Sequence, residues 1–335
     1  MALLLLIATL QEIREEDSYL ADLERRYEAI LRQAERSVVA VHVTRKPEEK
    51  KRRNPFSGVM GGDGGLFGNR PENAAATGVV VGADLVLTTY FNISGDVEEI
   101  YVQLPDGGRR DATVKGYDAV TDIALLELAH GDDLAAVETP RERGVDVGQA
   151  VVAVGISPGR GLSIFPGIVS ARDRVLGWGI QHDAKLNYGN VGGPLFDLDG
   201  RLVALTTGVS TERAASTGQN SGVGEALLWS KVSESLEYLK KGGKNKGAYL
   251  GIEGRDRDEG GVNVDVVQEG MGAAKYGVKA NDIIVEFDGK TVNTMEELRD
   301  LIKKQRIGDE VTVTVERGGE RVELKVVLGE RPENE

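Results

Sequence analysis

The stretch from Gln181 to Leu205, QHDAKLNYGNVGGPLFDLDGRLVAL, carries the densest structural signal of the chain. At its centre, Gly189-Asn190-Val191-Gly192-Gly193-Pro194 predicts a tight turn, because glycine reaches backbone conformations that other residues disfavour. Asp199-Gly200 then predicts a hairpin turn before an apolar strand. Taken alone, this is an ordinary Gly-rich turn between strands. The function of the turn has to be inferred from the other segments of the chain.

Two upstream segments continue the pattern of short β-rich runs. An apolar run leads into Leu87-Thr88-Thr89-Tyr90-Phe91-Asn92-Ile93, and Thr121-Asp122-Ile123-Ala124-Leu125-Leu126 opens another strand. In this order, the three segments together resemble the HtrA family of trypsin-like serine proteases. The resemblance implies a mainly β fold with a chymotrypsin-like double β-barrel, and a catalytic triad in the chain order His, Asp, Ser.

The triad positions of that family fall here on Phe91, Asp122 and Val191. The turn Gly189-Asn190-Val191 matches the family's oxyanion hole, whose donors are backbone N–H groups. Valine cannot form an acyl-enzyme, and phenylalanine can neither take nor return a proton. In subtilisin, loss of the serine or the histidine costs on the order of 10⁶ in turnover. The sequence therefore predicts a pseudoprotease.

Asp122 is then a vestigial triad member. An ionised carboxylate left unpaired in a dry site is costly, so we expect Asp122 to find another partner, to move toward water, or to have a raised pKa. The hydroxyls of Thr88 and Thr89 and nearby backbone amides are the candidate partners.

Other residues could in principle supply the chemistry. The chain has three histidines, His42, His130 and His182, and none matches a catalytic base position. They share no metal-ligand spacing and the chain has no cysteine, so we expect neither a metal site nor a cofactor. An unusual nucleophile remains an alternative, with Thr88, Thr89 and Ser163 as the candidates.

Composition limits the partners. The net charge of −13 argues against nucleic acid, because phosphate binding needs a concentrated basic surface. The first ten residues, MALLLLIATL, are too short an apolar run to span a bilayer. They resemble the apolar part of a secretory signal but lack a basic start, or else they begin a helix that continues to Ser37. Following the family, we expect export to the periplasm or cell envelope.

Composition and periodicity divide the chain into an N-terminal segment and helix (1–37), a protease-like domain (38–241), a linker (242–247) and a C-terminal domain (248–329). Within the second part, residues 45–77 are polar and Gly-rich and predict a long mobile loop. The loop lies where HtrA proteins have a regulatory loop. In that family, this loop and the N-terminal segment help to build a trimer.

The C-terminal domain resembles the PDZ domains of HtrA proteins. Tyr249-Leu250-Gly251-Ile252 matches the loop that binds a terminal carboxylate, and a helix capped by Thr294 carries Leu298 and Ile302 on one face. The resemblance implies that a peptide adds as a strand beside Ile252, with its carboxylate held by loop N–H groups.

Three functions remain open from the sequence. The chain could be an inactive HtrA-like protein that binds C-terminal or unfolded peptides, and this is the function that we favour. It could be a protease with a non-standard nucleophile, which a covalent serine-hydrolase probe would reveal. It could also be a regulatory subunit that joins an active paralogue in a hetero-oligomer instead of forming a homotrimer.

Overall fold

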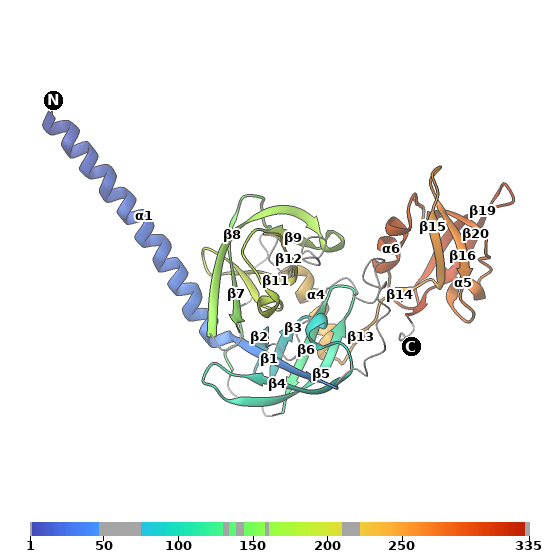
Figure 1. Ribbon diagram of the computed structural model, residues 1–335, viewed down its shortest axis with the longest axis horizontal. Coiled ribbons are helices and arrows are strands. Elements are labelled where there is room, and N and C mark those ends of the chain that lie inside the picture. Colours follow the sequence, from blue (N-terminus) through green and yellow to red (C-terminus); the bar gives the residue numbers. More distant parts are fainter. Residues whose placement is uncertain are drawn as a thin grey trace, which may run out of the picture. The chain divides into compact units, whose positions relative to one another are not determined.

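The computed structural model describes residues 2–46, 75–129, 134–138, 144–157, 161–209 and 222–331. The chain forms two compact units. The first comprises residues 1–117 and 121–243, and the second comprises residues 118–120 and 244–335. The predicted pair of β-barrels is confirmed and lies in the first unit (Figure 1).

The first barrel is built from antiparallel strands in the order β5-β4-β1-β2-β3-β6, and it closes through a pairing of β5 with β6. Its interior is packed with valine, leucine and isoleucine side chains, because these β-branched and aliphatic residues alternate inward along each strand. The strands are β1 (Val38–Arg45), β2 (Ala76–Gly82), β3 (Leu85–Thr88), β4 (Val97–Gln103), β5 (Arg109–Asp118) and β6 (Ile123–Leu128).

The second barrel closes in the order β10-β11-β12-β9-β8-β7. Helix α4 (Trp229–Lys240) follows the barrel and buries Trp229, Val232 and Leu239. The strands are β7 (Ala150–Ser157), β8 (Gly161–Arg174), β9 (Gly179–His182), β10 (Pro194–Asp197), β11 (Leu202–Val209) and β12 (Gly224–Leu228).

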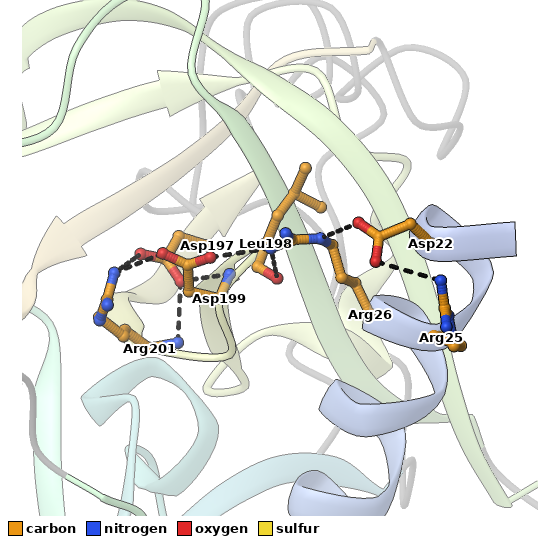
Figure 2. Close-up of polar contacts among 7 residues, drawn as sticks. All are labelled: Asp22, Arg25, Arg26, Asp197, Leu198, Asp199 and Arg201. Atoms are coloured by element: carbon orange, nitrogen blue, oxygen red, sulfur yellow. Dashed lines mark hydrogen bonds and ion pairs between the residues drawn. The ribbon is translucent and has the colours of Figure 1, made fainter. Parts of the chain in front are cut away.

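Helix α1 (Ala2–Ser37) precedes the barrels and packs its last turns on the core, where Ile30 and Ala34 are buried. Ionic contacts add to this packing (Figure 2). Arg26 binds Asp22 on its own helix and Asp199 at the β10–β11 turn, both at 2.8 Å. Hydrogen bonds to Arg26 lower the pKa values of both carboxyls. These groups are exposed, so solvent screens the ion pairs and the buried apolar face holds the helix.

The second unit is a small antiparallel sheet in the order β15-β16-β17-β19-β20, covered by two helices (Figure 1). Sixteen side chains from Ala248 to Leu328 form its own core. Its elements are β14 (Ala248–Tyr249), β15 (Ile252–Asp256), β16 (Val262–Val267), α5 (Gly272–Lys275), β17 (Ile283–Phe287), β18 (Lys290–Thr291), α6 (Met295–Lys303), β19 (Glu310–Arg317), β20 (Glu320–Val327) and β21 (Gly329–Glu330).

The predicted linker, residues 242–247, has hydrogen bonds that its composition does not suggest. The carbonyl of Gly243 accepts from the amide of Tyr117 at 3.0 Å, and that of Asn245 accepts from Ala119 at 2.8 Å. Residues Lys244–Asn245 form the short strand β13. Most of the predicted loop 45–77 lies outside the described residues, whereas its last two residues, Ala76 and Thr77, belong to β2. Among the described helices, none is long and apolar enough to cross a membrane.

Candidate functional site

The backbone of the first barrel places Phe91 directly beside Asp122. Phe91 lies on the short helix α2 (Tyr90–Ile93), which Thr89 caps by accepting from the Asn92 amide. Asp122 precedes β6 and has a left-handed backbone with φ of 57°. Its carboxylate Oδ1 accepts a hydrogen bond from the Phe91 amide at 2.7 Å, and its carbonyl accepts from the Tyr90 amide at 3.3 Å. Of the three outcomes expected for this buried carboxylate, the structure shows the first, because a backbone amide supplies a donor.

Val191 lies on the turn before β10, and hydrogen bonds link it to β2 and α2 of the first barrel. Its side chain is buried, and its carbonyl accepts from the Thr77 amide at 3.3 Å and from Asn92 Nδ2 at 3.0 Å. Because Asn92 follows Phe91 in α2, these bonds bring Phe91, Asp122 and Val191 into one site. The site joins the two barrels through buried polar contacts.

The glycines after Val191 are required by space. A Cβ on Gly192 would lie 2.3 Å from the carbonyl oxygen of Thr77, and its φ is 91°. A Cβ on Gly193 would lie 2.1 Å from the carbonyl oxygen of Val154. No real side chain fits at such distances, so the tight turn predicted from the sequence depends on both glycines.

Two of the three N–H groups expected to form an oxyanion hole donate within the turn itself. The Gly189 amide donates to Asn187 Oδ1 at 2.9 Å, and the Asn190 amide donates to the Asn187 carbonyl at 2.9 Å. The short helix η2 (Tyr188–Asn190) follows from this local bonding. In this conformation Asn187 accepts hydrogen bonds from both amides, one through its side chain and one through its carbonyl.

Thr77 is a site residue that the sequence does not reveal. It is fully buried, and its hydroxyl donates to the Gly189 carbonyl at 2.6 Å while accepting from the Ile156 amide at 2.9 Å. Its own carbonyl accepts from the Thr88 hydroxyl at 2.8 Å. Thr77 thus joins strands of both barrels to the turn. A threonine at the start of a strand has no local pattern that would have indicated this role.

The described histidines lie elsewhere. His42 on β1 stacks on Tyr101 with ring centroids 4.5 Å apart, and burial lowers its pKa. His182 on β9 is fully buried in the second barrel, and burial lowers its pKa to about 4. His130 lies outside the described residues. Within the described part of the chain, no group of His, Cys, Asp and Glu side chains could hold a metal ion.

The alternative nucleophiles differ in accessibility. Thr88 and Thr89 are fully buried, and both serve local structure: Thr88 bonds to Thr77 and Thr89 caps α2. Ser163 is half-buried on β8, paired with Gly155 of β7. A buried hydroxyl that donates to a carbonyl is poorly placed to attack a substrate.

The predicted peptide-binding residues gather at the start of β15 and on α6. Gly251 has φ of 87°, and a Cβ there would lie 2.2 Å from Met271 Cβ, so the loop requires glycine. The carbonyl groups of Leu250 and Gly251 accept from the Ala273 and Gln268 amides. These two hydrogen bonds fix the shape of the loop through its carbonyl groups.

The side chains at this loop and on α6 differ in exposure. Tyr249 and Ile252 are half-buried. Leu250 and Leu298 are buried at 1% and 0% exposure, and Ile302 is 9% exposed. Leu298 therefore holds α6 on the core, whereas Ile252 offers surface to a ligand.

Comparison with known proteins defines the class of both units. Residues 76–205 match the trypsin-like peptidase domain, and residues 248–328 match the PDZ domain. The periplasmic serine endoprotease DegP of Escherichia coli K12 is 31% identical over 303 residues, covering 84% of this chain. The periplasmic pH-dependent serine endoprotease DegQ of the same strain is 33% identical over 278 residues, covering 77% of this chain. The chain spans 62% of the length of DegP and 60% of that of DegQ.

Solved structures agree on the fold. The HtrA-type protease AlgW with a decapeptide superposes with a TM-score of 0.68 at 24% identity, covering 92% of this chain and 99% of that chain. A serine endoprotease from Yersinia pestis gives a TM-score of 0.66 at 24% identity, covering 91% and 98%.

The fold and the matched segments define a trypsin-like double barrel followed by a PDZ domain. The chain belongs to the HtrA/DegP family as a homologue of its serine proteases.

Proposed function

We propose that the chain is a catalytically inactive HtrA homologue that binds C-terminal peptides and unfolded chains through its PDZ domain. The observation that carries this proposal is a pair of buried apolar residues at two of the three proposed triad positions. Phe91 and Val191, at the positions matched to the catalytic histidine and serine, are 8% and 2% exposed. Neither side chain can exchange a proton or attack a carbonyl, so acyl transfer has no nucleophile and no base.

The contacts around the turn support this proposal. The Gly189 amide is engaged by Asn187, and the Val191 carbonyl is held by Thr77 and Asn92. These contacts stabilise the turn by satisfying its hydrogen-bonding groups with protein groups, so that no substrate is needed to hold its conformation. The alternative of a protease with a non-standard nucleophile gains no support from Thr88 and Thr89, because both are buried and used in local hydrogen bonds. Ser163, which is half-buried, is the candidate that the labelling experiment tests.

The PDZ domain supplies the binding activity in this proposal. Strand β15 lies at one edge of the sheet, and an edge strand can pair with an added peptide strand. The AlgW structures named with a decapeptide and a tripeptide support peptide as the ligand class. The relatives are named periplasmic, which supports export of this chain to the periplasm or cell envelope.

Two measurements on the full chain test the proposal. Fluorophosphonate should not label the protein, and casein should not be cleaved after contaminating proteases are removed. Labelling at Thr88, Thr89 or Ser163 would instead support the non-standard protease.

The binding half is tested with a peptide that ends in an apolar residue. The free-acid peptide should bind more tightly than the same peptide amidated at its C-terminus, because the carboxylate makes charge-assisted bonds to loop N–H groups. Equal affinities for the acid and the amide would reject the PDZ-mediated function.

A further inference from the structure

Sulfur chemistry in this chain is confined to methionine, because the sequence has four methionines and no cysteine. Met271 and Met295 belong to the second compact unit, whereas Met1 and Met60 lie outside the described residues. Both methionines of the second unit are half-buried, so solvent reaches part of each residue. They are therefore the sulfur atoms at which a small oxidant acts on the folded PDZ domain.

Met295, the first residue of helix α6, connects this helix to strand β15 through its main chain and its side chain. Its amide donates to Asp256 Oδ1 at 2.6 Å, and its side chain packs against the core of the unit. The Cε atom, which is bonded to the sulfur, lies 3.0 Å from the position that a Cβ on Gly254 would occupy. The thioether therefore covers a strand residue that has no side chain of its own.

Met271 packs in a similar way on the loop before the strand. It is the N-cap residue of α5, and its Cβ and Cγ atoms lie 2.2 Å and 2.9 Å from the position that a Cβ on Gly251 would occupy. Gly251 directly precedes β15 and has a left-handed backbone with φ of 87°. A methionine thus lies against bare glycine backbone both before β15 and in its middle.

Oxidation changes the chemistry of both contacts. Hydrogen peroxide transfers one oxygen atom to a thioether: the O–O bond breaks, an S–O bond forms, the sulfur loses two electrons, and water is released. Methionine fills irregular gaps because its thioether is apolar and flexible, whereas the sulfoxide is polar and chiral. Burial of such a polar group without a hydrogen bond is costly, so the oxidised side chain moves toward water and uncovers the glycine.

We propose that Met271 and Met295 are oxidation sites for hydrogen peroxide, and that their sulfoxides loosen the loop before β15 and the contact of β15 with α6. Peptide affinity then falls, an effect that rests on the proposed function of the PDZ domain. The loosening of the strand does not rest on it. The step is reversible, because methionine sulfoxide reductases use two thiols to regenerate the thioether, forming a disulfide and water.

The test begins with the full-length protein in hydrogen peroxide. Desalting removes the oxidant, and mass spectrometry locates the sulfoxides. Calorimetry then measures binding of acetyl-Gly-Ser-Thr-Ala-Tyr-Val with a free carboxylate, a peptide that contains no methionine. Oxidised wild-type protein should bind this peptide at least about fivefold more weakly than untreated protein. Incubation with dithiothreitol and both methionine sulfoxide reductases, one for each epimer, should restore the original affinity.

The matched control is the double variant Met271→Leu with Met295→Leu. Leucine keeps an apolar side chain of similar volume, and peroxide does not oxidise it. Whatever affinity this variant has before treatment, peroxide should leave that affinity within about twofold. Each single substitution should remove part of the sensitivity of the wild-type protein.

Three results would overturn the proposal. The first is a mass spectrum without sulfoxide at either position, and the second is an unchanged affinity when both sulfoxides are present. The third is an equal loss of affinity in the treated leucine variant, because the damage would then lie elsewhere.

A failure of the proposed function can be told apart from a failure of the oxidation sites. If the untreated protein does not bind the peptide, the proposed function fails, and amide hydrogen exchange on the full-length protein decides the oxidation proposal alone. Amides of residues 250–256 should exchange faster in the oxidised wild type, because the strand opens more often. They should be unaffected in the treated leucine variant. Unchanged exchange in the oxidised wild type would reject the proposal.

Discussion

His182 gives the second barrel a pH dependence. The imidazole is fully buried, and neither ring nitrogen has a hydrogen-bond partner among the described residues. Burial lowers its pKa from 6.5 to about 4, with Asp183 acting weakly in the opposite direction. Between pH 6.5 and 4 the unfolded chain therefore binds a proton at His182 and the folded chain does not. The free energy of unfolding falls as the pH falls through this range. The loss is about 3 kcal/mol from this group.

The first prediction follows from that sign. His182→Gln cannot titrate, so its free energy of unfolding should fall by about 3 kcal/mol less than that of the wild type between pH 7.5 and 4. Urea unfolding followed by tryptophan fluorescence measures this, because Trp178 and Trp229 both lie in the barrel unit. Parallel pH profiles for the two proteins would show that His182 titrates alike in both states.

The second prediction concerns the proposed catalytic positions. Phe91→His together with Val191→Ser should restore fluorophosphonate labelling and slow casein cleavage, with Asp122 already in place. Each single change should give no signal above background, because triad members act as a unit. An inert but folded double variant would contradict the proposed alignment of these positions or show that the turn cannot accept a substrate.

Adding Asn187→Ala to the double variant is a third, separate prediction. It removes the acceptor that engages the Gly189 amide, and one oxyanion donor is worth about 10²–10³ in kcat in subtilisin. The triple variant should therefore turn over casein faster than the double variant. Equal rates would mean that Asn187 already moves aside when a substrate binds.

The resemblance of three short motifs to the HtrA family was sufficient to select Phe91, Asp122 and Val191 as one candidate site. Short motifs surround each of them, and the motifs occur in the right order. Thr77 and Asn92 could not be selected in the same way. Their decisive bonds reach Gly189 and Val191, 112 and 99 positions further along the chain. Such contacts exist only once the two barrels have formed.

At the scale of the element, the loop before β15 depends on a single glycine. Gly251→Ala must adopt a φ of 87° and place its Cβ against Met271. Left-handed backbone costs about 1–2 kcal/mol and overpacking adds about 1–3 kcal/mol, so we expect a loss of about 3 kcal/mol in the PDZ unit. Urea unfolding followed by circular dichroism would measure it, and peptide affinity should fall as the loop is displaced.

Gly319→Ala is the matched control for this fourth prediction. Gly319 has a similar φ of 88°, but a Cβ there meets nothing within 4 Å. Gly319→Ala should therefore lower the free energy of unfolding only through the strain of a left-handed backbone, by about 1 kcal/mol. Equal losses for the two variants would show that the contact with Met271 contributes nothing.

Several elements follow from sequence because their determinants are local. The tight turn at Gly192 and Gly193 and the Thr294 cap of α6 both form where the sequence predicts them. The Glu297 side chain adds a second contact at this end of the helix by accepting from the Asn293 amide at 2.8 Å. Residues 242–247 look like a free linker by composition. Their bonds to Tyr117 and Ala119 come from segments more than 120 positions away and were not predictable.

For the whole molecule, the fifth prediction is that residues 247–330 fold alone. The core of this unit consists entirely of its own side chains between Ala248 and Leu328. A domain of this length should unfold cooperatively with about 4 kcal/mol or more of stability. Circular dichroism in urea would measure it, because this segment contains no tryptophan. A transition without cooperativity would show that the unit needs the rest of the chain.

The hydrogen bond from the Phe91 amide to Asp122 has an evolutionary consequence. The donor is main chain, so the bond persists whichever side chain occupies position 91. Under the proposed function, selection for a stable fold therefore maintains this contact, and with it the position of Asp122, even though catalysis is no longer selected. A return to proteolysis would need two substitutions, neither of which is rewarded alone. A lineage that carries Phe91 and Val191 would gain no activity from the first of the two substitutions. Loss of proteolytic activity is therefore easily fixed and seldom reversed.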